Sequence, residues 1–561
     1  MAEAQFSSLY QQQAGQVQWS PDGRYVAAAA GHRLVVRDAV NFDIVPGGLR
    51  SCQDKIEAIE WASDSDLILC AQYQRSLVEV FSLCRPEWHC RVREGVAGMV
   101  RAMWSPDARH VLTFADFALH LSIWSLVTQK MYTIRQPKAM PGSVAFSPDE
   151  RILAVATRRD CRDFVALHDT VSWEPLGGFP VDTVDLVSIQ WSPDGTTICV
   201  QDTSLEYRVL FYAPDGSILG RLEAYEGALG VKTMSWSPPG TPPLLAVGSY
   251  DQRLRLVTPH NWRAVAELKH VHPRAQPRSA RCGPVACYRE VPKEEAEAEA
   301  EAAGVKEKEK ANASLAATAP SFSVSRGTGG NGRGRASSSF VSSASRSRQP
   351  LSTASFSFSS STAAAAAAGP GATALSHLGL KPAQRGRGPS GPGRRPGGPG
   401  RPGLRVGPGA GGVTYTRDLP AGGIVSERPD PTKPNPRLGA GLVSWSFDGS
   451  LVATRNDNMG GAVWVWDAEG MGLRSVLVQM EHVRSAKWNP RRPVLAVCTG
   501  NGRIYLWSPS GASWLDVPTE GFGVLGFRWA PDGESIVLLS RDKMCCCFLN
   551  NVMDQDGQVR S

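Results

Sequence analysis

The stretch Val17-Gln-Trp-Ser-Pro-Asp-Gly-Arg-Tyr-Val-Ala-Ala-Ala-Ala-Gly-His-Arg-Leu-Val-Val-Arg-Asp38 contains the unit from which the chain is built. An apolar strand is expected to end at Trp19, followed by a Ser-Pro-Asp-Gly turn, a strand of small residues and a third, alternating strand. Pro21 presets the backbone of the turn, Asp22 can accept bonds from nearby backbone N–H groups, and Gly23 tolerates a positive φ. The stretch therefore predicts a three-stranded meander.

The same anchor, an aromatic residue that ends the first strand of the unit, recurs nine times along the chain. The nine anchors are Trp19, Trp61, Trp104, Phe146, Trp191, Trp236, Trp445, Trp488 and Trp529. Neighbouring anchors lie 41 to 45 residues apart, except for one interval of 209 residues after Trp236. A period of about 40–45 residues is typical of WD40 propeller blades. We therefore expect an all-β fold, a WD40 β-propeller.

The long interval separates six repeat units from the last three. Three blades cannot close a ring by themselves, whereas six plus three can, and the entropy lost on closing a loop grows only logarithmically with its length. One ring of about nine blades is therefore favoured. A ring of eight blades with one irregular unit, or two small propellers, are the alternatives.

The last unit lacks a fourth strand, because only a polar tail follows it. The segment before the first anchor is able to supply that strand, with Phe6, Leu9 and Tyr10 beside the strand from Met544 to Phe548. Closure by this route would remove an unpaired sheet edge.

Composition divides the chain into four segments. Residues 1–274 should hold the closing strand and blades one to six, and residues 436–550 should hold blades seven to nine, followed by a polar tail at 551–561. Between them, residues 275–435 run through Glu/Ala/Lys-rich, Ser-rich, poly-Ala and Gly/Pro/Arg-rich sequence. Such sequence buries too little apolar area to offset its ordering entropy. We expect a long disordered insertion.

The positive charge of the chain belongs to this insertion. Of the net +7, residues 275–435 contribute +11, from 22 Lys and Arg against 11 Asp and Glu, which leaves −4 for the repeats. The Arg-Gly-rich run from Arg385 to Arg401 could bind RNA by charge. No aromatic residue that could stack on bases lies between Ala383 and Gly412, so a linker is favoured and nucleic-acid binding is the alternative.

Sequence motifs for catalysis are absent. The chain contains no phosphate-binding loop, no Gly-x-Ser-x-Gly elbow and no His-Glu-x-x-His motif, and its twelve Cys include no Cys-x-x-Cys pair. No apolar run approaches the ~20 residues that a membrane helix needs. We expect a soluble, intracellular protein that is not an enzyme, with reduced thiols, no cofactor and no metal site.

Polar loops between the strands carry the best candidates for partner binding, because loops on a rigid scaffold usually hold the binding residues. Arg158, Arg159, Arg455 and Asn456 are the candidates. Asp251 is also in such a loop, but a structural role is favoured for it, in which it bonds the turn beneath it.

Several segments outside the generic repeat pattern resemble WD-repeat protein eight, a family of WD40 proteins of centrosomes and spindle poles. They include Pro86-Glu-Trp-His-Cys90, Arg159-Asp-Cys-Arg-Asp163, Ala246-Val-Gly-Ser-Tyr-Asp251, Ala453-Thr-Arg-Asn-Asp-Asn458 and Ala462-Val-Trp-Val-Trp-Asp467. The resemblance implies a scaffold at the centrosome, basal body or spindle pole that supports microtubule minus-end organisation and cilium assembly. It implies a coiled-coil microtubule-anchoring partner similar to the synovial-sarcoma-X-breakpoint interacting protein, and a minus-end-directed kinesin.

Overall fold

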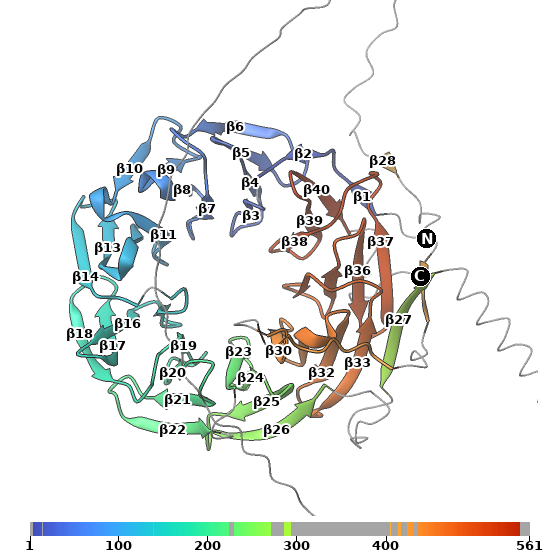
Figure 1. Cartoon of the computed structure of the whole chain (residues 1–561). Helices are drawn as coiled ribbons and strands as arrows, with labels where there is room; N and C mark the ends of the chain where they lie inside the picture. Colours follow the sequence, from blue (N-terminus) through green and yellow to red (C-terminus); the bar gives the residue numbers. More distant parts are fainter. Residues whose placement is uncertain are drawn as a thin grey trace, which may run out of the picture. The chain divides into compact units, whose positions relative to one another are not determined.

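The computed structural model describes residues 4–13, 15–138, 140–223, 229–270, 285–292, 404–405, 413–416, 423–430, 432 and 436–549. They fall within one compact unit that combines Met1–Lys306 with Gly400–Ser561, whereas the second unit, Glu307–Pro399, lies outside them. The described part of the first unit contains nine β-sheets, which form the blades of one ring (Figure 1). The predicted all-β propeller of nine blades is confirmed.

Each blade is an antiparallel meander, whose strands we call a, b, c and d from the centre of the ring outward. Blades one to three consist of β3 (Val17–Trp19), β4 (Tyr25–Ala30), β5 (Arg33–Asp38) and β6 (Ile44–Ser51); β7 (Ala58–Trp61), β8 (Leu67–Gln72), β9 (Leu77–Ser82) and β10 (His89–Arg93); and β11 (Met99–Trp104), β12 (His110–Ala115), β13 (His120–Ser125) and β14 (Met131–Arg135). Short 3-10 turns occur at η1 (Tyr73–Arg75), η2 (Gly95–Ala97), η3 (Asp116–Ala118) and η5 (Asp457–Met459).

The next three blades follow the same order. They consist of β15 (Val144–Phe146), β16 (Ile152–Arg159), β17 (Arg162–Asp169) and β18 (Pro175–Pro180); β19 (Ser188–Trp191), β20 (Ile198–Gln201), β21 (Arg208–Tyr212) and β22 (Ile218–Glu223); and β23 (Val231–Trp236), β24 (Leu245–Ser249), β25 (Arg253–Thr258) and β26 (Arg263–Lys269).

Blades seven and nine carry additional strands. Blade seven consists of β30 (Ala440–Trp445), β31 (Leu451–Asn456), β32 (Ala462–Asp467) and β33 (Gly472–Val478), extended by β27 (Ala286–Pro292) and β29 (Val413–Thr416). Blade eight consists of β34 (Ser485–Trp488), β35 (Leu495–Cys498), β36 (Arg503–Ser508) and β37 (Gly511–Asp516). Blade nine consists of β38 (Gly526–Trp529), β39 (Ser535–Leu539) and β40 (Lys543–Phe548), completed by β1 (Gln5–Phe6), β2 (Tyr10–Gln11) and β28 (Leu404–Arg405).

The antiparallel order gives the ring two different faces. The turns from strand a to b and from c to d lie on one face, which we call the a–b face. The turns from b to c and the crossings into the next blade lie on the other, the b–c face. The hydrophobic core lies between neighbouring blades: the buried cluster that includes Val165 and Val200, for example, draws on blades four and five.

The a–b turns form as the repeat predicts. In blade one, Ser20 Oγ donates to Asp22 Oδ1 at 2.6 Å and accepts a bond from the Tyr25 N–H, while Gly23 has φ of 76°. The same Ser–Asp bond occurs at Ser105–Asp107, Ser147–Asp149, Ser192–Asp194 and Ser446–Asp448. These five turns are therefore stabilised by their own side chains.

The anchor tryptophans connect neighbouring blades at the inner edge of the ring. Seven of the eight donate their indole N–H to the backbone carbonyl just before the anchor of the preceding blade, at 3.0 to 3.3 Å. These bonds are Trp19 to Arg528, Trp61 to Gln18, Trp104 to Glu60, Trp191 to Ala145, Trp445 to Ser235, Trp488 to Ser444 and Trp529 to Lys487. Phe146 has no N–H to donate, and the buried indole nitrogen of Trp236 has no hydrogen-bond partner in the described structure.

We predict that Trp61→Phe destabilises the ring more than Trp236→Phe does. The first change leaves the half-buried Gln18 carbonyl without its indole donor, which costs about 1 kcal/mol, the lower end of the range for a buried group. The second removes an N–H that makes no bond among the described residues and shares the same loss of ring volume. Denaturant unfolding of the two variants checks the prediction, and equal losses of stability would contradict it.

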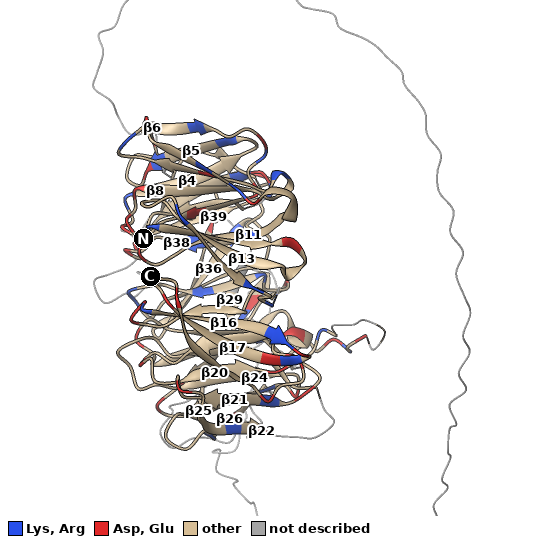
Figure 2. Cartoon of the chain, turned by 90° about the vertical axis from the view of Figure 1, so that its left-hand side faces the viewer, with Lys and Arg blue, Asp and Glu red and all other residues tan. Residues whose placement is uncertain are grey.

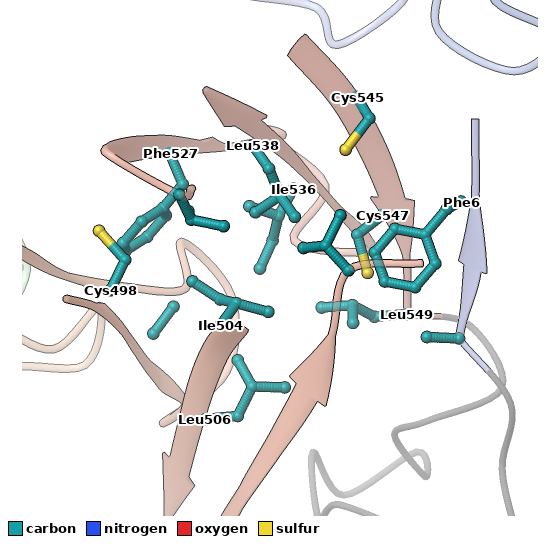
Figure 3. Close-up of a cluster of buried hydrophobic side chains, with 14 of the residues drawn as sticks. Phe6, Cys498, Ile504, Leu506, Phe527, Ile536, Leu538, Cys545, Cys547 and Leu549 are labelled. Carbon is teal, nitrogen blue, oxygen red and sulfur yellow. The ribbon is translucent and has the colours of Figure 1, made fainter. Parts of the chain in front are cut away.

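The N-terminal segment closes the ring. β1 and β2 both pair antiparallel with β40, with Phe6 opposite Cys547 and Tyr10 opposite Met544. Figure 3 shows the Phe6 ring packed beside Cys547, within a cluster that also contains Ile504 of blade eight. Leu9 lies against the same cluster, so the predicted closing strand is confirmed, although it is split into two short strands.

We predict that Phe6→Ala lowers the stability of the ring by about 3–5 kcal/mol, as is typical for a buried aromatic residue. Deleting residues 1–12 should in addition promote association, because it exposes the edge of β40. Leu49→Ala is the matched control, since Leu49 is 55% exposed on β6. A deletion variant with an unchanged melting temperature would overturn the closure.

The boundaries expected for the insertion need correction. Three strands lie between residues 275 and 435: β27 pairs parallel with β33, β29 pairs with β27, and β28 pairs with β1 of blade nine. Tyr288 is buried, and Glu290, 5% exposed, accepts a bond from Tyr505 Oη at 2.5 Å. β27 pairs with the open edge of blade seven. Composition does not reveal such a tertiary contact. The rest of the insertion, including the Arg-Gly-rich run, is almost entirely outside the described residues.

We predict that replacing residues 293–403 by a flexible linker leaves the melting temperature nearly unchanged, because β27, β28 and β29 remain. Removing all of residues 275–435 should lower it, because Tyr288 and Glu290 would leave the contacts of blades seven and eight. Thermal melts of the two deletions provide the test. Equal melting temperatures would show that the three strands do not contribute to stability.

Candidate protein-interaction site

All four residues predicted to bind a partner lie at the same end of the ring. Arg158 and Arg159 end strand b of blade four, and Arg455 and Asn456 end strand b of blade seven. Because b strands run in the same direction in every blade, both pairs belong to the b–c face. Their surroundings differ, and this decides which of them are available.

Arg158 belongs to an ion-pair network on blade four. Its guanidinium lies 2.9 Å from Asp185 and 3.9 Å from Asp163, and Lys138 Nζ contacts the same two carboxylates at 2.6 and 3.0 Å. Burial opposes the ionisation of Asp163, but bonds from the Leu186 N–H and from Lys138 outweigh it and lower its pKa. The charge of Arg158 is therefore already largely compensated.

Arg159 differs because no acidic side chain in the described part of the chain forms an ion pair with it. Its guanidinium carbon lies 4.9 Å from the centre of the Phe164 ring, and its partner across the hairpin is Arg162. Like charges directly opposite each other in a sheet repel. The tip of the hairpin is a turn with positive φ at both Asp160 (49°) and Cys161 (60°), which matches a type I′ turn. Figure 2 shows charges of both signs at this end of β16 and β17.

Arg455 and Asn456 have structural contacts instead. Arg455 donates to the carbonyl of Val483 and lies 2.9 Å from Asp457, which ties strand b to the crossing into blade eight. Asn456 is fully buried and donates to Gln252 Oε1 of blade six at 3.2 Å. The prediction of Asn456 as a contact residue is corrected for this reason: its side chain does not reach the surface.

Asp251 has the structural role expected for it. Its carboxylate accepts a bond from the Arg253 N–H at 3.1 Å and lies 2.7 Å from the buried guanidinium of Arg255. It therefore stabilises the turn between β24 and β25.

Blade three presents an apolar projection on the b–c face that sequence reasoning missed. Phe117 lies at the tip of the turn between β12 and β13, with 85% of the residue exposed. Phe117 and Ala118 have φ of 54° and 53°, a left-handed conformation that costs roughly 1–2 kcal/mol for each non-glycine residue. Leu119 beside it is 53% exposed, and Val96, in the neighbouring crossing, is fully exposed.

A hollow of about 690 Å³ lies next to this projection. It is lined by Phe117, Ala118, Leu119, His120, Thr133, Arg135 and Gln136. His120 in its lining is held by the buried carboxylate of Glu94, which lies 2.7 Å from His120 Nε2 and also accepts bonds from Ser122 Oγ at 2.6 Å and from Thr113. Arg135 at its rim is exposed and makes no ion pair with any described residue.

These blade-three residues and the arginines at the hairpin tip of blade four lie on the b–c face of two neighbouring blades. We call Val96, Phe117, Leu119, Arg135, Arg159 and Arg162 the blade three–four surface. Its apolar side chains would receive the apolar stripe of a helix, and its three arginines would pair with carboxylates beside that stripe. A Phe at a turn between two strands was the signal in the sequence, but the sequence does not show whether such a ring points inward or outward.

No group of three or more His, Cys, Asp and Glu side chains in the described part of the chain could hold a metal ion. No helix in this part of the chain has the length and apolar character needed to cross a membrane.

Comparisons with known proteins place the ring in a family. The WD domain, G-beta repeat family matches residues 474–508. Mouse WD repeat-containing protein WRAP73 is 36% identical over 535 residues, which cover 95% of this chain and 93% of that protein. An uncharacterized WD repeat-containing protein of Schizosaccharomyces pombe, C32H8.09, is 24% identical over 44% of this chain and 53% of its own length.

Solved propellers are more distant. The Dos1 propeller matches with a TM-score of 0.34 and 14% identity, over 43% of this chain and 67% of that chain. The Myceliophteria thermophila Cps50 (Swd1) propeller domain matches with a TM-score of 0.32 and 13% identity, over 47% and 90%. The assignment therefore rests on the mouse protein, whose similarity spans nearly the full length of both chains. The chain belongs to the family of WD repeat-containing proteins that includes mouse WRAP73.

Proposed function

We propose that this protein is a non-enzymatic scaffold of the centrosome, basal body or spindle pole, which binds a coiled-coil microtubule-anchoring protein through its blade three–four surface. The partner is similar to the synovial-sarcoma-X-breakpoint interacting protein, and a minus-end-directed kinesin joins the assembly. In this role the protein supports microtubule minus-end organisation and cilium assembly. The location and the partners come from the sequence resemblance to WD-repeat protein eight.

One observation supports the surface more than any other: Phe117 is held in solvent by a turn that costs conformational energy. An exposed aromatic side chain of this kind is typical of a protein interface, where aromatic and arginine residues dominate the binding energy. Non-glycine residues in the left-handed backbone conformation are also concentrated at functional sites.

Charge supports a helical, acidic partner. Arg159 and Arg162 oppose each other across the hairpin with no described acidic partner, so a carboxylate placed between them would relieve their repulsion. Coiled-coil helices carry Glu beside their apolar seam and fit this requirement. Nucleic acid fits less well, since the repeat segments carry −4 in total.

The test is capture of the coiled-coil partner by the full chain and its variants. We predict that Arg159→Glu with Arg162→Glu, and separately Phe117→Ala, weaken capture by about tenfold or more, as loss of a central interface residue does. Melting temperatures should hold, because all three side chains are exposed. Arg109→Glu with Arg151→Glu is the matched control: both are exposed on the a–b face of the same two blades.

Capture that survives both site variants would exclude the blade three–four surface while leaving the scaffold role intact. Diffuse localisation of the tagged protein, without foci at the centrosome, basal body or spindle pole, would contradict the scaffold role itself. The RNA alternative is separated by the same protein: tight RNA binding by a ring without residues 293–403 would overturn the adaptor proposal.

A further inference from the structure

A second hollow lies on the a–b face, at the ends of the a strands where blades eight, nine and one meet. It measures about 430 Å³, and its walls include the anchor tryptophans Trp19, Trp488 and Trp529. All three indoles donate their N–H groups to the backbone of the preceding blade: Trp529 to the Lys487 carbonyl, Trp19 to the Arg528 carbonyl and Trp488 to the Ser444 carbonyl. The indole surfaces, with Pro531, are left as apolar wall.

Two cations stand in this hollow without a counter-ion. Lys487 and Arg528 occupy equivalent positions in successive blades, and among the described residues neither forms an ion pair. Lys487 Nζ has one long contact, 3.5 Å, to the Phe527 carbonyl, and the buried Nε of Arg528 has no hydrogen-bond partner there. Asp532, the nearest acidic residue in the sequence, accepts a bond from the Glu534 N–H instead.

The surroundings oppose the charged forms of Lys487 and Arg528. Burial and the neighbouring charge of Arg528 lower the pKa of Lys487, although this residue remains partly exposed to solvent, and burial lowers the pKa of Arg528. The acidic residue at the same position of another blade is Glu60, on blade two, and it forms no ion pair with either cation. Two partly desolvated like charges are stabilised by an anion that bridges them.

We infer that this hollow binds an acidic side chain of an extended peptide, with its carboxylate between Lys487 and Arg528 and an adjacent apolar or proline residue against Trp19 and Pro531. The apolar walls decide for a peptide over a free inorganic anion. Indole and proline surfaces offer a hydrated phosphate no bond, whereas they pack well on aliphatic and proline side chains. The site is on the a–b face, so it is separate from the blade three–four surface and independent of the proposed function.

The experiment measures binding of a fluorescent peptide of alternating Glu and Pro residues to the full chain by polarisation. We predict saturable binding that falls with added salt and is absent for the matched peptide of Gln and Pro. Lys487→Gln with Arg528→Gln should weaken binding about 10- to 100-fold, the effect of losing charge-assisted bonds. Arg109→Gln, an exposed cation on the same face of blade three, should leave it unchanged.

Folding is controlled within the same set of variants. Because neither cation makes an ion pair in the described structure, the double variant should melt no lower than the wild type, and Lys487→Arg should retain binding. Equal binding by the double variant, or by the Gln peptide, would overturn the site. Competition by inorganic phosphate as effective as by the unlabelled Glu peptide would show a simple anion site and reject the peptide. Capture of the coiled-coil partner should persist in the double variant.

Discussion

The hydrogen bond from an anchor indole to the backbone of the preceding blade is the interaction on which the ring depends. It points the same way in each blade that makes it, including the bond from Trp19 to Arg528 that joins the first blade to the last. Because the acceptor is a backbone carbonyl, the side chain of the accepting residue is unrestricted. Gln18, Glu60 and Lys487 all serve as acceptors. The main chain thus stabilises the ring at this position, and the side chain of the accepting residue remains free to vary.

This separation explains why the two faces of the ring are so different. Five of the nine a–b turns, those of blades one, three, four, five and seven, share one Ser-x-Asp design that serves the fold. The b–c turns have no common design: blade three has an exposed Phe117, blade four a long hairpin that ends in Asp160 and Cys161, and blade seven the buried Asn456. Individual turns on a uniform scaffold are where specific binding is expected to arise. The hollow between Lys487 and Arg528 also depends on a position that varies between blades, the residue just before the anchor.

The ring could be predicted from the sequence because its determinants are local and repeated. The anchor spacing indicates the number of blades, and the Ser-Pro-Asp-Gly turn needs only its own residues. The closing strand was predictable by elimination, since blade nine lacked an outer strand. β27 could not be found in this way, because a seven-residue strand in a biased segment is stabilised only by the edge of blade seven. Composition reports average character, whereas a strand added to an edge depends on a distant partner.

The candidate site was only partly predictable. Arg158 and Arg159 are adjacent and chemically identical, yet one faces Asp185 and the other faces Arg162, a difference set by the hairpin and the neighbouring crossing. Asn456 belongs to a residue type that is common in surface loops, but it lies under the junction with blade six. Exposure depends on the packing of several blades, so no local pattern reveals it.

The pairing of Phe6 with Cys547 also sets an order of events during synthesis. The two residues are about 540 positions apart, and a ribosome that adds ~5–20 residues per second needs roughly 30 to 110 s to connect them. Throughout that time the first strand made has no partner, and eight blades can form before the ring is able to shut. A nascent chain of this protein is therefore an open arc with an apolar end, and its dependence on chaperones should be greatest just before β40 is made.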